Sequence, residues 1–104
     1  MGYRILPPAR EELQDASRWY ERQREGLGHA LLDEFEERLA LALDQPQAGT
    51  IVGVTPQGRP VRRHRLRRFA RYSILIFVDE GGTATVVAFS HSSRRPAHWK
   101  DRIR

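Results

Sequence analysis

The feature that most constrains the fold is a pair of apolar runs joined by a short, glycine-containing turn. The runs Tyr72–Val78 and Thr83–Phe89 are rich in β-branched and aromatic side chains, and Asp79–Gly82 lies between them. Because glycine accepts φ > 0 without a Cβ clash, this pattern predicts a β-hairpin. The first run is apolar at both odd and even positions, which is typical of a central strand covered on both faces.

Arginine side chains are concentrated at the two ends of this predicted hairpin. Residues equally far from a hairpin turn face each other across the ladder, so Arg71 is expected to return close to His91. Further arginines follow His91 directly along the chain. The sequence therefore predicts one basic patch at the end of the sheet distal to the turn, formed by Arg68, Arg71, His91, Arg94 and Arg95.

Two amphipathic helices are predicted before the hairpin. Apolar residues recur at spacings of three and four, which predicts helices over about residues 9–24 and 27–44. The short connection at Gly26–Gly28 indicates an antiparallel helical hairpin. We expect Phe35, Trp19 and Tyr20 to pack in the core. The acidic face of the second helix is expected to be solvated; it comprises Asp33, Glu34, Glu36 and Glu37.

The remaining segments complete an α+β domain. Tyr3–Leu6 is a short candidate for an edge strand, and Val61–Phe69 is a strand candidate before the hairpin. Residues 45–60 contain three prolines and three glycines, which indicates a loop with a brief extended piece at Thr50–Val54. Ser92–Trp99 is expected to turn into a short C-terminal helix. The prediction is one domain, 1–104, with a helical hairpin on an antiparallel sheet in the order β-α-α-β-β-β.

The basic charge belongs to the C-terminal half of the chain. The 104 residues carry a net charge of +5. Residues 1–58 hold 6 basic and 10 acidic side chains, a net of −4, whereas residues 59–104 hold 12 basic and 3 acidic ones, a net of +9. Lys100 is the only lysine. Because the guanidinium fork of arginine matches carboxylates and phosphates, this half is expected to bind an acidic partner.

Several classes of site are not expected. Cysteine is absent, so no disulfide or thiolate site can form, which agrees with a reducing cytoplasm. No stretch approaches the roughly 20 apolar residues of a transmembrane helix, and the N-terminus has no apolar run long enough for a signal peptide. His29 and Asp33 form a lone pair rather than a set of metal ligands. We expect a cytoplasmic protein without metal, cofactor or membrane span.

Three motifs, in order along almost the whole chain, carry a resemblance to a known family. They are Trp19-Tyr20-Glu21-x-Gln23-x-x-Gly26-Leu27-Gly28, then Leu66-Arg67-Arg68-Phe69, and last His91-x-x-Arg94-x-Pro96-x-x-Trp99. Together they resemble the RelE/ParE superfamily of toxins from bacterial type II toxin–antitoxin modules, and the ParE-like plasmid-stabilisation branch in particular. The sequence departs from the family where Ala70-Arg71 stands in place of the usual proline before Tyr72.

The resemblance implies a growth-inhibiting toxin that forms a complex with a small cognate antitoxin. ParE-like members are described as blocking DNA gyrase, whereas RelE-like members are endoribonucleases that cut mRNA on the ribosome. A third alternative is a non-toxic, basic nucleic-acid-binding module. Since all three share one fold, the fold does not choose between them.

The candidate site residues differ between these alternatives. In a nuclease, Arg68, Arg71, His91 and Arg94 would be catalytic, with His91 or His64 carrying the proton and the arginines stabilising phosphate charge. No tyrosine lies near the C-terminus, and the indole of Trp99 does not titrate, so the sequence favours binding without catalysis. The binding surface would then comprise Arg65, Arg67, Arg68, Arg71, Arg94, Arg95 and Trp99.

Overall fold

A five-stranded sheet in the order β1-β5-β4-β3-β2 is the centre of the structure, a computed structural model that describes residues 2–103. The predicted hairpin forms its middle, and its first strand is the central strand of the five, as the two-sided apolar pattern indicates. The strands are β1 (Tyr3–Ile5), β2 (Thr50–Val54), β3 (Pro60–Arg65), β4 (Tyr72–Val78) and β5 (Ala84–His91).

The α+β class and the position of the first strand at the sheet edge are confirmed, but the sheet is mixed rather than wholly antiparallel. β1 pairs with β5 in parallel, with Tyr3 opposite Ala84 and Ile5 opposite Val86. A tight turn between two neighbouring strands makes them run antiparallel. β1 is followed by a helix instead of a tight turn, so its connection leaves β1 able to pair in parallel. The piece at Thr50–Val54 is also a full strand, which pairs with β3.

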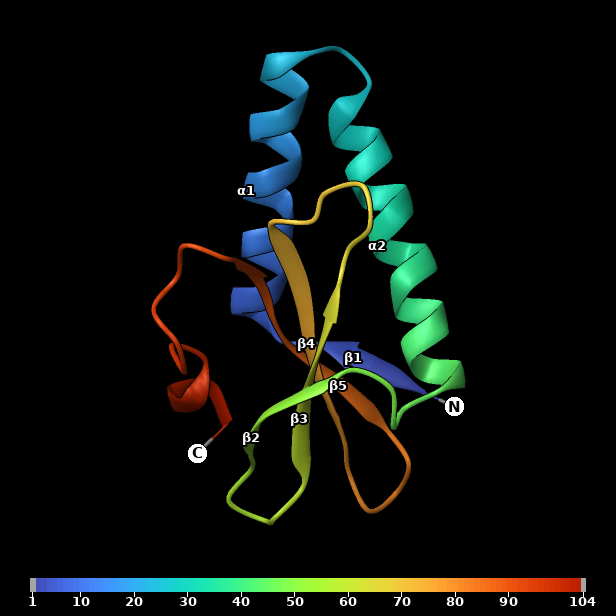
Figure 1. The fold of residues 1–104 in the computed structure, drawn as a ribbon, viewed down its shortest axis with the longest axis vertical. Helices are drawn as coiled ribbons and strands as arrows, with labels where there is room; N and C mark the ends of the chain where they lie inside the picture. Colours follow the sequence, from blue (N-terminus) through green and yellow to red (C-terminus); the bar gives the residue numbers. More distant parts are fainter. Residues whose placement is uncertain (1, 104) are drawn as a thin grey trace.

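Two antiparallel helices, α1 (Pro7–Gln23) and α2 (Leu27–Asp44), lie side by side against the sheet, as predicted (Figure 1). The two prolines that open α1 occupy its first turn. Backbone N–H groups there have no acceptor within the helix, so the N–H that proline lacks costs no hydrogen bond. One stripe of side chains along α2 is buried. Its buried members are Gly28, Leu31, Phe35, Leu39 and Ala42.

The connection between the helices explains the first motif. Gly26 has φ = 89°, a left-handed conformation that favours glycine. The Glu21 carboxylate accepts the backbone N–H groups of Gly26 at 2.9 Å and Gly28 at 3.0 Å. These hydrogen bonds to the charged form lower the pKa of Glu21. The motif therefore closes the helical hairpin rather than supplying a functional group.

Replacing Gly28 with alanine is expected to destabilise the protein by about 1–3 kcal/mol, because an added Cβ would overlap the carbonyl oxygen of Ser17 on the facing helix. Urea denaturation would measure the loss. Gly81→Ala is the matched control, since a Cβ there meets nothing closer than 3.4 Å. Equal denaturation midpoints for the two variants would mean that the helices do not need this close approach.

The sheet has an apolar cluster on each face, which confirms the two-sided pattern of β4. Ile74 and Ile76 pack toward the helices in one cluster, and Leu75 packs with Val61 and Trp99 in the other. The β4–β5 register shifts between Leu75 and Ile76, which is the mark of a β-bulge. This irregularity explains why the apolar side chains of Thr83–Phe89 do not alternate cleanly between the two faces of the sheet.

The segment after β3 differs from the prediction of a strand over Val61–Phe69. β3 ends at Arg65, and the chain then turns. Leu66 and Phe69 are buried in the helix-side cluster. The Glu34 carboxylate of α2 accepts the backbone N–H groups of Arg67 and, at 3.0 Å, Arg68. Glu34 therefore anchors this turn, so the acidic face of α2 is not wholly solvated as expected.

Candidate functional site

The hairpin brings Arg71 and His91 together, as its turn predicts. Tyr72 lies opposite His91 in the β4–β5 register, and the Ser92 backbone N–H donates to the Arg71 carbonyl oxygen at 2.7 Å. Beyond them the chain turns back over the end of the sheet and encloses a cavity of about 250 Å³. We call it the distal cavity; among its lining residues are Arg63, Arg65, Arg71, Ser73, Ser90, His91, Arg94, Arg95, His98 and Trp99.

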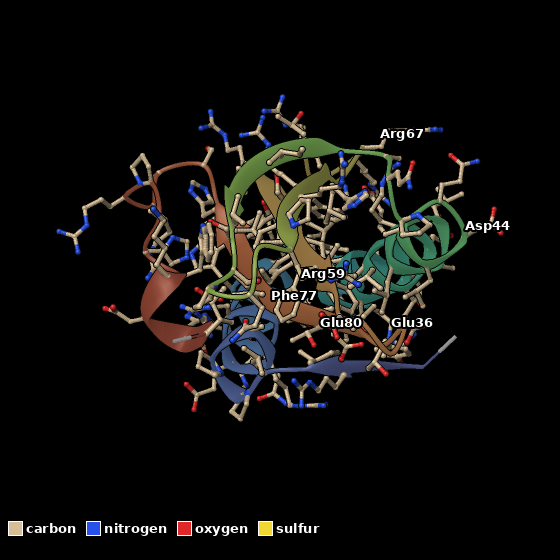
Figure 2. The ribbon with its side chains drawn as sticks, turned by 90° about the horizontal axis from the view of Figure 1, so that it is seen from below. Glu36, Asp44, Arg59, Arg67, Phe77 and Glu80 are labelled. Atoms are coloured by element: carbon tan, nitrogen blue, oxygen red, sulfur yellow. The ribbon has the colours of Figure 1, made fainter. Side chains whose placement is uncertain are left out.

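The predicted patch divides between two places. Arg65, Arg71, Arg94 and Arg95 line the distal cavity together with His91, whereas Arg67 and Arg68 line a different cavity beside α2. Figure 2 shows Arg67 extending away from the C-terminal segment, on the other side of the molecule. The Arg68 guanidinium lies 5.6 Å from the ring centroid of Phe69. The turn after β3 therefore places Arg68 at the cavity beside α2, whereas Arg71 and His91 line the distal cavity.

The two tryptophans are placed differently from each other. Trp99 is 2% exposed and packs over Gly53, where an added Cβ would lie 2.6 Å from its ring. Its ring therefore forms an inner wall of the distal cavity rather than a platform for a partner. Trp19 was expected in the core but is 49% exposed, with its ring edge-on to Tyr20 at 5.0 Å between centroids. Only Tyr20 of this pair packs against the helix-side cluster.

The sequence did not identify Glu12 as part of the site. Its carboxylate binds Arg102 at 2.7 and 3.0 Å and Arg94 at 3.2 Å, and it accepts the Phe89 backbone N–H at 3.2 Å. The Glu12 and Arg102 side chains are each 15% exposed. This cluster holds the C-terminal segment, including the short 3₁₀ helix η1 (Lys100–Ile103), against α1. Figure 1 shows this segment beside the start of α1.

A signal for Glu12 was present in the sequence. It lies three residues after Ala9 and four before Ala16, both buried. The helical period therefore assigns this carboxylate to the apolar face of α1. A carboxylate in such a position needs a cationic partner when the helix packs. The partner itself was not predictable, because Arg102 lies 90 residues further along the chain.

The three histidines near the sheet have different environments. His64 is buried on the helix-facing side, where burial and then the charges of Arg38 and Arg62 lower its pKa. His98 also has a lowered pKa, chiefly through burial, and its Nε2 lies 3.7 Å from the Glu12 carboxylate. The His91 Nδ1 accepts the Ser93 backbone N–H at 3.0 Å, which assigns the ring proton to Nε2.

The arrangement is suited to binding an anion. Arginine side chains converge on the distal cavity from β3, the β4–β5 hairpin and the C-terminal segment, and none of its described lining residues is an Asp or Glu. Within residues 2–103, no cluster of three His, Cys, Asp or Glu residues could hold a metal ion. No helix in the same range is long and apolar enough to cross a membrane.

The comparisons with known proteins agree with this architecture. A family model described as ParE toxin of type II toxin-antitoxin system, parDE, matches residues 3–96. A search of curated proteins finds no match. The matched range begins at β1 and includes both helices, all five strands and the arginines of the distal cavity. Since it covers almost the whole chain, the protein belongs to the ParE toxin family of type II toxin–antitoxin systems.

Proposed function

We propose that this toxin acts in the cytoplasm by binding DNA gyrase without catalysis of its own, and that a small cognate antitoxin neutralises it in a heteromeric complex. The observation that carries this proposal is the composition of the distal cavity. It gathers five arginines from separate segments, and among residues 2–103 no Asp or Glu that could serve as an acid or base lines it. Such a surface recognises acidic groups on a partner.

The positions of the histidines also favour binding over RNA cleavage. His64, one of the two candidate proton carriers, is buried on the opposite face of the sheet from the distal cavity. His91 lines the cavity, but its Nδ1 already accepts the Ser93 N–H, so its basic nitrogen is occupied. A general base must reach the proton that it abstracts. Tyr72 points toward the helices, and burial raises its pKa.

Two parallel assays test this proposal. We expect the purified toxin to inhibit supercoiling of plasmid DNA by gyrase and to leave mRNA on ribosomes intact. His91→Ala is expected to retain full inhibition, within about twofold, because it deletes a proton carrier and little charge. Ribosome-dependent mRNA cleavage that His91→Ala removes would instead establish the RelE-like nuclease. Nucleic-acid binding with neither activity would indicate the non-toxic module.

A further inference from the structure

Two serines form the floor of the distal cavity. The strand register places Arg65 opposite Ser73 and Ser73 opposite Ser90, so these three side chains lie in a row across the face away from the helices. Ser73 is 7% exposed, and among residues 2–103 its hydroxyl has no hydrogen-bond partner. The Ser90 hydroxyl makes only a long contact of 3.4 Å with the His91 carbonyl. Two donors on the floor are therefore available to a ligand.

The rim of the cavity has excess positive charge. Arg94 is paired with Glu12, but Arg63, Arg65, Arg71 and Arg95 make no ion pair within residues 2–103. Guanidinium groups that converge without a counter-charge repel one another, and the repulsion is relieved when an anion lies among them. An oxyanion in the cavity would accept a hydrogen bond from the buried serine hydroxyl and would balance the charge of the unpaired arginines above it.

The size and shape of the cavity restrict the kind of molecule that can carry this oxyanion. Its volume of about 250 Å³ lies below the roughly 300–1,000 Å³ of most small-molecule sites, so it accommodates one group of a larger partner. Nucleic-acid sites combine exposed aromatic rings with a basic track. Here Trp99 is buried against Gly53, and the arginines converge on one point. These features favour an acidic protein side chain over a phosphodiester.

We propose that the distal cavity binds the carboxylate of an Asp or Glu in an acidic segment of a protein partner, with Ser73 and Ser90 donating hydrogen bonds and the arginines surrounding the charge. This inference rests on the proposed protein-binding function and names the group that the surface recognises. Serine hydroxyls determine where the carboxylate sits, and the arginines supply most of the attraction.

Titration with a hexaglutamate peptide tests the site, with an RNA hexanucleotide as the competing probe. Ser73→Ala removes one hydroxyl and no charge, and it is expected to weaken peptide binding about tenfold, because a hydrogen bond to a charged group is lost. Arg65→Gln is expected to have at least the same effect. Arg67→Gln removes one charge outside the cavity and should change the affinity by less than about twofold. If Ser73→Ala does not melt cooperatively, Ser90→Ala takes its place, because Ser90 is only half-buried.

Three outcomes would overturn the inference. If Arg65→Gln and Arg67→Gln lose the same affinity for the peptide, the binding is general charge attraction and not recognition by the cavity. Tighter binding of the hexanucleotide, with dependence on Ser73, would make the cavity a phosphodiester site. No peptide binding by a toxin that still inhibits gyrase would overturn the cavity site alone and leave the proposed function intact. Conversely, Ser73-dependent peptide binding by a protein that leaves gyrase active would overturn the proposed function and keep the site.

Discussion

Phe35→Ala is expected to lower the free energy of unfolding by about 3–5 kcal/mol, through the lost burial of the ring and the cavity that it leaves. Phe35 is 4% exposed at the middle of α2, and its ring lies edge-on to Phe89 of β5 at 5.8 Å between centroids. It therefore joins the helical hairpin to the sheet. Small domains are stable by only about 5–15 kcal/mol, so this one change removes a large part of the total.

A thermal melt measures this effect, and we expect the midpoint to fall by at least about 10 °C. The matched control is Leu41→Ala on the same helix, because Leu41 is 52% exposed and its loss should cost within about 0.5 kcal/mol. If Phe35→Ala melts within a degree or two of the wild type, Phe35 does not belong to the core that the structure assigns to it.

The parts of the fold that depend on short-range pattern were predictable from the sequence. The turn at Asp79–Gly82 fixes the pairing of β4 with β5, and this pairing alone places Arg71 beside His91. The helices were predicted within two residues at each end, because apolar spacing and the prolines and glycines determine their limits. Local rules of this kind do not depend on where distant segments pack.

The remaining features depend on contacts between distant segments. The sequence predicts a strand through Phe69, but the strand ends at Arg65 and Arg68 lines the cavity beside α2. The turn that ends this strand is held by Glu34, which lies 34 residues earlier than Arg68. Trp19 was expected in the core together with Tyr20, but it is exposed. A helix turns by about 100° per residue, so consecutive side chains do not share one narrow face.

The position of Arg94 depends on a similar long-range contact. Its guanidinium is held by Glu12, 82 residues earlier, while half of its side chain remains exposed. Glu12 therefore orders the start of the C-terminal segment and presents Arg94 at the rim of the distal cavity. A pre-positioned arginine loses less conformational entropy on binding than a free one, which makes Arg94 a strong candidate for a hot spot in the proposed gyrase-binding surface.

Replacing both Arg94 and Arg95 with alanine is accordingly expected to abolish growth inhibition and to weaken gyrase inhibition at least about a hundredfold, since arginine hot spots each contribute about 2 kcal/mol or more. The fold should persist, because Glu12 keeps its paired hydrogen bonds to Arg102 at 2.7 and 3.0 Å. A thermal melt checks this point, and colony counts after induction measure the toxicity.

The charge-matched control for this double variant is Arg22→Ala with Arg24→Ala. Both residues are exposed at the connected end of the helical hairpin, so the control lowers the net charge equally while leaving the distal cavity intact. We expect it to arrest growth like the wild type. If it fails as completely as the double variant at Arg94 and Arg95, net charge rather than this surface determines toxicity.

If growth arrest survives in cells that contain folded protein with both Arg94 and Arg95 replaced, the toxic surface lies elsewhere. The exposed face around Trp19 on α1 then becomes the next surface to test.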